Sequence, residues 1–174
     1  MLPSHIEAEN RYHQLRTLAL QLAQDDSKSQ HQAPLKFKLI DSLALQEAAH
    51  WELSPRRLVD WDWFAGYHDF KRRYPKRFEV ALWQAESLVG LSMGRPTYNG
   101  HSLRLDFIEA RPKDLGPRPL VVSETLVAYG VYARLLNASQ IRIMHPINPE
   151  VRAYYEQFGY HYRQEGDFLY KEVV

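Results

Sequence analysis

The sequence predicts an α/β fold built on one mixed β-sheet with helices on both of its faces. An apolar strand at 101–110, an apolar helix at 121–136 and a short strand at 140–144 follow one another. A strand–helix–strand run of this length implies a right-handed crossover between two parallel strands. Upstream, alternating segments at 77–84 and 88–95 complete an antiparallel meander with the 101–110 strand, and Asn99-Gly100 is a strong hairpin signal.

Composition narrows the class of protein. The chain has 174 residues, of which 45% are hydrophobic and 13% aromatic, so it can bury a substantial core as one domain. The net charge is +1, from 22 basic and 21 acidic residues, which gives no general case for nucleic-acid binding. There is no cysteine, which excludes disulfides and thiolate sites, and His101, His145 and His161 lack metal-ligand spacing, so we expect no metal. No segment is typical of a signal peptide or a membrane span, so we expect a cytoplasmic protein.

The first 34 residues are expected to form a separate N-terminal unit, followed by the main domain at 35–174. A helix is predicted over Ile6–Gln24, because Tyr12, Leu15, Leu18, Ala19 and Leu22 fall on one stripe. The polar segment Asp25–Pro34 is predicted to be a linker. The helix could pack on the main domain or on a second subunit, so the sequence is compatible with a homodimer.

The main domain is predicted to open with a half-buried strand at 35–40 and a helix that runs from Ser42 to about His50. Ser54-Pro55 predicts the start of another helix, which ends near Arg73. On it, Trp63, Tyr67 and Phe70 share a face that is typical of an ordinary core. The basic run Lys71–Arg77 either contacts phosphates or forms a solvated helix end.

The third strand of the meander has an irregular pattern. Leu103, Leu105 and Phe107 are predicted to share its apolar face, and strict alternation would then place Glu109 on that face too. Either the strand bulges before its end, or Glu109 lies at the margin of the sheet. The loop Arg111–Pro119 follows and leads into the 121–136 helix, where exposed N–H groups offer an anion site.

The C-terminal part carries a well-punctuated helix and a hairpin. Asn148 is predicted to cap the helix, Pro149 to open it and Gly159 to end it. Tyr155 lies beside its C-terminal turn, on an apolar stripe that could equally make it a core aromatic. Strands at 160–163 and 168–173 are expected to close the sheet.

These motifs together resemble the GNAT superfamily of acyl-CoA-dependent N-acetyltransferases. Ala110-Arg111-Pro112 matches the strand end that meets the pyrophosphate loop in that family, and Asn148, Tyr155, Gly159 and Tyr160 keep the spacing of its closing motif. The resemblance covers roughly 36–174. Gly116 stands at the first glycine of the loop, whereas Leu115 and Arg118 replace a polar and a small residue.

The resemblance implies a twisted mixed sheet with a V-shaped cleft between its central parallel strands. It also implies an enzyme, an acyltransferase that moves an acetyl group from acetyl-CoA to a primary amine on a small molecule or a peptide. Tyr155 would be the general acid that protonates the leaving thiolate. The residues expected to hold acetyl-CoA are Phe107, Ile108, Ala110, Lys113, Leu115, Gly116, Pro117, Arg118 and Asn148.

The general base and the acceptor are less well defined by the sequence. Glu109 is the first choice of base and Asp106 the second, although either carboxylate could simply be solvated, and His145 could act through water. The aromatic segment Trp61–Phe70 would line the acceptor side, where Asp60 and Asp62 could attract a cationic amine.

Two alternatives to this function remain open. Arg118 either supplies positive charge in place of a missing loop amide or fills the pyrophosphate site and abolishes binding, which would make the protein a catalytically silent binding or regulatory module. Alternatively, the acceptor amine belongs to an RNA, with Lys71–Arg77 as the contact.

Overall fold

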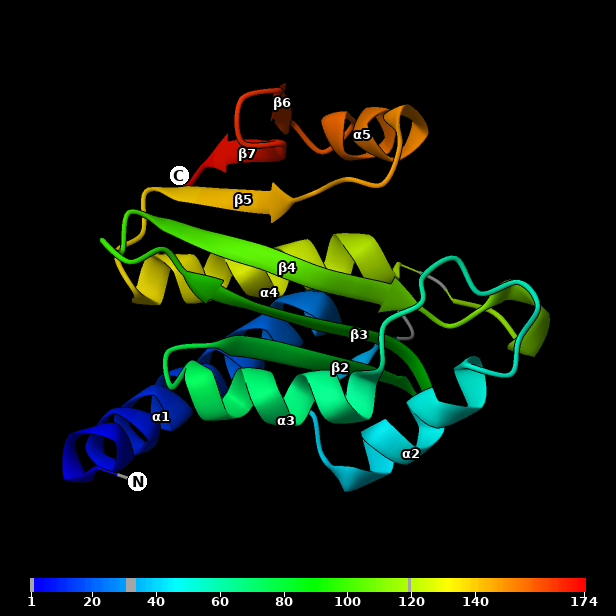
Figure 1. The fold of residues 1–174 in the computed structure, drawn as a ribbon, viewed down its shortest axis with the longest axis horizontal. Helices are drawn as coiled ribbons and strands as arrows, with labels where there is room; N and C mark the ends of the chain where they lie inside the picture. Colours follow the sequence, from blue (N-terminus) through cyan, green and yellow to red (C-terminus); the bar gives the residue numbers. More distant parts are fainter. Residues whose placement is uncertain (1, 31–33, 119) are drawn as a thin grey trace.

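The computed structural model describes residues 2–30, 34–118 and 120–174 (Figure 1). They form a seven-stranded sheet in the order β1-β2-β3-β4-β5-β7-β6, in which β4 and β5 pair in parallel and the other neighbours antiparallel. The predicted mixed α/β sheet is therefore confirmed. In chain order the elements are α1 (Pro3–Gln30), β1 (Lys36–Lys38), α2 (Ser42–Trp51), α3 (Trp63–Arg73), β2 (Phe78–Gln84), β3 (Ser87–Pro96), β4 (Ser102–Ala110), the 3-10 turn η1 (Lys113–Leu115), α4 (Val121–Leu135), β5 (Gln140–Met144), α5 (Pro149–Glu156), β6 (His161–Arg163) and β7 (Phe168–Glu172).

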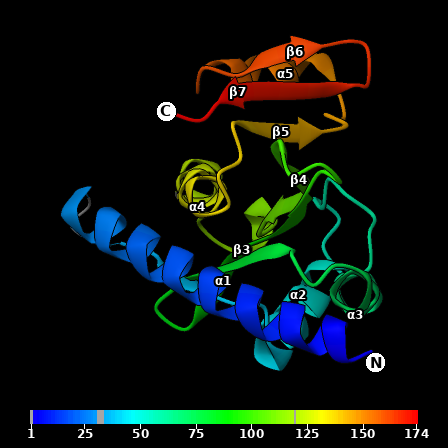
Figure 2. The ribbon, with the colours of Figure 1, turned by 90° about the vertical axis from the view of Figure 1, so that its left-hand side faces the viewer.

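Helices cover both faces of the sheet, as Figures 1 and 2 show. On one face, α1, α4 and α5 pack over a large core that includes Tyr129, Tyr132 and Tyr155. On the other face, α2 and α3 pack over a second core around Trp51, Trp63 and Met93. No helix among the described residues is long and apolar enough to cross a membrane.

Helix α1 is longer than predicted and rotated about its axis. It continues through Gln30, so the predicted linker is wrong over its first six residues, and 31–33 lie outside the described residues. Of the predicted stripe, Ala19 is buried and Leu15 packs against the core, but Leu18 and Leu22 are each 42% exposed. Leu20 and Ala23, which the stripe did not include, are buried in the core. The division of the chain at residue 34 into two units stays a prediction.

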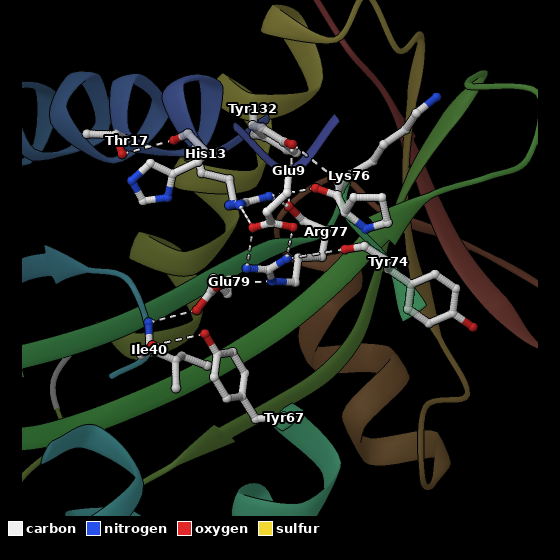
Figure 3. A network of polar contacts seen from close by, with 12 residues as sticks. Glu9, His13, Thr17, Ile40, Tyr67, Tyr74, Lys76, Arg77, Glu79 and Tyr132 are labelled. Atoms are coloured by element: carbon white, nitrogen blue, oxygen red, sulfur yellow. Dashed lines mark hydrogen bonds and ion pairs between the residues drawn. The ribbon is translucent and has the colours of Figure 1, made fainter. Parts of the chain in front are cut away.

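A buried network of charges joins α1 to the sheet (Figure 3). The Glu9 carboxylate accepts hydrogen bonds from Nη1 and Nη2 of Arg77, at 2.8 and 3.0 Å, and from Nη2 of Arg16, at 2.5 Å. Arg77 also donates through Nε to Glu79 at 2.9 Å, and the other oxygen of Glu79 accepts the Ile40 N–H at 2.9 Å. Every charge in the network is thus paired, which is the condition under which buried charges are tolerated. It also places Arg77, at 2% exposure, out of reach of any nucleic acid.

The segment between α2 and α3 is a loop and not the helix predicted from Ser54-Pro55. Helix α3 begins at Trp63, after Asp62, whose side chain accepts the Ala65 N–H at 3.0 Å. The loop is held instead by Arg57, which donates through Nη2 to the Trp61 carbonyl at 2.6 Å. A side-chain tie of this kind offers the backbone an alternative to helical hydrogen bonds. The predicted buried face of Trp63, Tyr67 and Phe70 is confirmed.

Strand β4 contains the bulge that its sequence pattern indicated. Gly94 of β3 pairs with Leu105, but the preceding Met93 pairs with Phe107, so Asp106 is the extra residue. Before the bulge, Leu103 and Leu105 face the α4 core, and after it Phe107 and Glu109 face α3. The prediction that Phe107 shares a face with Leu105 is wrong, because one inserted residue reverses the alternation.

Candidate functional site

The central parallel strands separate along their length and open a cleft. They pair from Ser102 and Gln140 as far as Leu105 and Ile143, but β4 then runs on to Ala110, whereas β5 ends at Met144. The cleft has a volume of about 470 Å³ and is lined by the second half of β4, the segment 143–147, α5, the loop after α2 and the start of α4. The expected V-shaped opening is confirmed. Past Leu105, the described part of β4 has no β-sheet partner on its β5 side.

Tyr155 projects from α5 toward this cleft. Its side chain is 4% exposed and lines the cleft, with Tyr154 and Tyr160 as edge-on aromatic neighbours. Its hydroxyl makes no hydrogen bond to the residues that the structure describes. Burial, assisted by Tyr154, raises the pKa of Tyr155 well above its usual range. The hydroxyl therefore stays protonated through the physiological range and is available as a hydrogen-bond donor.

Glu109 is fully engaged by its neighbours. Its Oε1 accepts from Arg57 Nε at 2.9 Å, while Oε2 accepts from Arg57 Nη2 at 3.1 Å and from Trp63 Nε1 at 2.6 Å. The residue is 6% exposed. The hydrogen bond from Arg57, opposed by burial, raises the pKa of that guanidinium. Glu109 thus attaches the loop after α2, through Arg57, to the end of β4.

Asp106, the residue inserted at the bulge, has a different environment. Its Oδ1 accepts hydrogen bonds from both Nε and Nη2 of Arg104, at 3.0 and 2.5 Å. Its Oδ2 is buried and has no hydrogen-bond partner among the described residues. The side chain is 9% exposed and lines the cleft. Of the two carboxylates that the sequence offered as general bases, Asp106 is the one with an oxygen left to accept a proton or a hydrogen bond.

The loop between β4 and α4 forms one end of the cleft. Gly116 has φ 139°, and a Cβ added there would lie 2.8 Å from Arg111 Nη2. Glycine is therefore needed because the Arg111 side chain passes under the loop and donates to the Pro117 carbonyl. Leu120 precedes α4 in the left-handed region and gives the helix no side-chain cap. The first N–H groups of α4 are thus left available at this end of the cleft.

The cleft carries more positive than negative charge. Arg57 and Arg104 are paired with Glu109 and Asp106, but Arg56 and Arg118 have no carboxylate partner among the described residues. Neither Arg56 nor Arg57 was singled out from the sequence. Little in the sequence indicates a functional role for these two arginines, because they directly follow Ser54-Pro55 and fall within the predicted helix start.

The predicted cofactor residues divide into two groups. Phe107, Ile108, Ala110 and Arg118 line the cleft together with Tyr155 and Glu109. Lys113, Leu115, Gly116 and Pro117 lie on the loop outside the lining, and Asn148 is exposed and caps α5 by accepting the Val151 N–H at 2.8 Å. His145 lines the cleft with φ 50°, and its ring contacts Asp167 at 3.3 Å. Asp60 and Asp62, the carboxylates predicted to attract a cationic amine, do not line this cleft.

Comparisons of the fold give consistent neighbours, although no protein-family profile and no curated protein sequence matches the chain. The structure is similar to an acetyltransferase of the GNAT family from Staphylococcus aureus Mu50, with TM-score 0.62, 14% identity and coverage of 80% of this chain and 99% of that chain. It is also similar to the ribosomal-protein-S18-alanine N-acetyltransferase from Escherichia coli, with TM-score 0.59, 14% identity and coverage of 80% and 94%. A variant of the spermidine N-acetyltransferase SpeG from Vibrio cholerae gives TM-score 0.58, 15% identity and coverage of 80% and 94%. The chain has the GNAT fold.

Proposed function

We propose that the protein is an acetyl-CoA-dependent N-acetyltransferase that acts on a primary amine. The observation that carries this proposal is the cleft between the diverging strands β4 and β5, which has Tyr155 in its wall and a positively charged end. Acetyl-CoA supplies an activated acetyl group as a thioester. The GNAT fold of the neighbours supports the same chemistry, while their acceptors, a ribosomal protein and spermidine by name, leave the acceptor open.

The residues present fit such a co-substrate along the whole cleft. The unpaired side of β4 from Phe107 to Ala110 offers backbone hydrogen bonds to an amide-bearing arm, as an exposed strand does for a peptide. The uncapped start of α4 and the unpaired guanidinium of Arg118 suit the pyrophosphate. Arg56 lies on the loop across the cleft and is a second cation for phosphate. The departures at Leu115 and Arg118 are thereby offset by arginines.

The chemical roles follow from the hydrogen-bonding state of each group. Tyr155 holds a proton and donates it, or a hydrogen bond, to the leaving sulfur. Asp106 accepts the proton of the acceptor ammonium, because Oδ2 has no other partner, whereas the oxygens of Glu109 already accept three hydrogen bonds. Glu109 remains in the site as the residue that positions the loop after α2, so the catalytic base moves from our first choice to our second.

The test is acetyl-CoA titration by calorimetry, followed by thiol release with a panel of amines. We expect micromolar affinity, about −8 kcal/mol, and turnover of at least one amine class. Tyr155→Phe should lower kcat by about 100-fold or more while leaving acetyl-CoA affinity unchanged, since general acid catalysis contributes about 10²–10⁴-fold. The same variant should keep its melting temperature, because the hydroxyl makes no hydrogen bond to the described residues that the substitution would remove.

The alternative of a silent binding module is favoured by one feature, the Arg111 guanidinium that occupies the space under Gly116. If acetyl-CoA fails to bind at millimolar concentration while the protein is folded, the enzyme proposal is wrong and the module remains. The RNA-linked acceptor also stays a prediction. Of the basic run expected to contact RNA, Arg77 is buried and so is not on the surface, while Arg72 and Arg73 both pair with Asp69.

A further inference from the structure

A second groove, of about 500 Å³, lies on the α3 side of β4 and shares residues with the cleft. Trp61, Arg104, Asp106 and Phe107 line both spaces. The ring of Phe107 packs edge-on against Trp61, at 5.2 Å between centroids, and against Phe70 of α3, at 6.3 Å. A ligand in this groove would therefore meet the reacting end of the cleft across Asp106, which gives the groove the position of an acceptor site.

Three arginines cross the sheet side by side next to this groove. Arg95 of β3 pairs with Arg104 of β4, and Arg104 pairs with Arg142 of β5. Residues directly opposite each other share a face of the sheet, and like charges in such pairs are destabilising. Two of the three are compensated, since Arg104 binds Asp106 and Arg142 donates to Gln140 at 2.7 Å and stacks on Phe168.

Arg95 is the exception in this row. Its guanidinium lies 4.4 Å from the ring centroid of Tyr74, and no described carboxylate lies within ion-pair distance of it. Two other arginines line the groove with it, and both are paired: Arg73 of α3 binds Asp69, and Arg104 of β4 binds Asp106. Among the described residues, Arg95 is therefore the groove cation that has aromatic support and no carboxylate partner.

Asp106 supplies the matching negative group. Its Oδ2 is buried and has no hydrogen-bond partner among the described residues, and a buried acceptor in that state is costly. Asp106 lines the groove, and the terminal torsion of an aspartate is soft, so its carboxylate can rotate to meet a ligand there. Of the other carboxylates there, Asp62 caps α3 and Asp69 binds Arg72 and Arg73.

We propose that this groove binds an acceptor that is a zwitterion, an amino acid whose carboxylate pairs with Arg95 and whose ammonium pairs with Asp106. The aromatic rings of Trp61, Phe70, Tyr74 and Phe107 surround the apolar part of such a molecule. The inference rests on the proposed function for its acetyl transfer step. The ammonium first gives one proton to Asp106, which releases it to water. The amine nitrogen then forms a bond to the acetyl carbon, the carbon–sulfur bond of the thioester breaks, and the second proton of the nitrogen passes to Asp106. The thiolate takes a proton from Tyr155, which water reprotonates.

The test compares amino acids with their amides, which keep the amine and the side chain but lack the carboxylate. L-phenylalanine and L-phenylalaninamide form the first pair, followed by the other standard amino acids. Acceptor kinetics at saturating acetyl-CoA are measured for the wild type, for Arg95→Gln, and for Arg11→Gln as a control on the exposed face of α1. We expect Arg95→Gln to raise KM for the preferred amino acid by roughly 10- to 100-fold, the value of a charge-assisted hydrogen bond, and to leave KM for its amide unchanged. Arg11→Gln should change neither.

A binding measurement without acetyl-CoA separates this inference from the proposed function. Saturation-transfer NMR with the same pairs should show the amino acid bound more tightly than its amide by the wild type but not by Arg95→Gln. If that pattern holds while no amine is acetylated, the groove is a zwitterion site and the enzyme proposal fails alone. If acetylation occurs but the amides are used as well as the amino acids, or Arg95→Gln shifts both equally, the inference is wrong. Salt-sensitive binding of a fluorescein-labelled single-stranded RNA that requires Arg95 would also overturn it, in favour of an extended polyanion.

Discussion

The substitution Glu109→Gln separates a positioning role of this residue from a catalytic one. Glutamine keeps one carbonyl oxygen for Trp63 Nε1 but removes the charge that pairs with Arg57, whose side chain is only 10% exposed. Breaking a buried ion pair costs about 3–5 kcal/mol, and we take the lower end, about 3 kcal/mol, because Arg57 borders the open cleft. For a chain of this size that corresponds to a fall of roughly 6–12 °C in melting temperature.

The assay is thermal unfolding of Glu109→Gln beside the exposed control Glu150→Gln, which should stay within about 0.5 kcal/mol of the wild type. Arg57→Met combined with Glu109→Leu should recover only part of the lost stability. Replacing both partners of a buried pair by apolar groups is often neutral, but Trp63 Nε1 and the Trp61 carbonyl lose their hydrogen-bond partners in this variant. A Glu109→Gln protein with an unchanged melting temperature and a kcat lowered 100-fold would refute this reasoning and restore Glu109 as the base.

Three further predictions follow from individual contacts. Arg118→Ala should weaken acetyl-CoA binding by roughly 10-fold in calorimetry, while Lys113→Ala, outside the cleft lining, should not. Although burial opposes the change, the hydrogen bonds and charges of Arg77 and Arg16 lower the pKa of Glu9 below 4.5. An acid whose pKa is lowered by folding stabilises the folded state above its unfolded pKa, so the free energy of unfolding should fall as the pH drops from about 4.5 through the lowered value. Glu9→Gln should make that fall less steep in acid-denaturation curves. Gly94→Ala should prevent folding or lower the melting temperature sharply, because its Cβ would lie 1.9 Å from the Arg104 carbonyl oxygen. Gly130→Ala in α4, whose added Cβ would lie 3.8 Å from its nearest neighbour, should instead raise the free energy of unfolding by up to about 1 kcal/mol. Thermal unfolding of both variants, followed by circular dichroism, measures the two effects.

The parts of the fold that the sequence predicts well are those fixed by neighbouring residues. Asn148 caps α5 and Asn99-Gly100 turns between β3 and β4 because each acts on backbone groups a few positions away. The strand β5 was predicted at its observed bounds, since two β-branched residues alternate between polar ones in a short run. Tyr155, which lines the cleft, was singled out through the spacing of a motif, which carries information that local propensity does not.

The parts that were missed depend on residues far apart in the sequence. The loop after α2 has the pattern of a helix start, but Arg57 is held by Glu109, 52 positions away. Helix α1 buries Arg16 and part of Glu9 because Arg77, 68 positions from Glu9, pairs with it. The pattern of apolar residues along the sequence cannot predict that this face of α1 is buried, because its buried groups are charged and only their distant partners make burial tolerable.

The bulge at Asp106 connects these distant contacts to the candidate site. Without the extra residue, alternation would turn Glu109 toward the apolar α4 core, where no described arginine could neutralise it, and Phe107 would leave Trp61 and Phe70. With it, Glu109 meets Arg57 and holds the loop, Phe107 completes the aromatic wall, and Asp106 itself lies in both the cleft and the groove with one oxygen unpaired. Gly94 makes the bulge sterically feasible, because any Cβ there would meet the β4 backbone. One irregularity in one strand therefore determines which carboxylate is bound by Arg57 and Trp63 and which keeps an oxygen without a hydrogen-bond partner among the described residues.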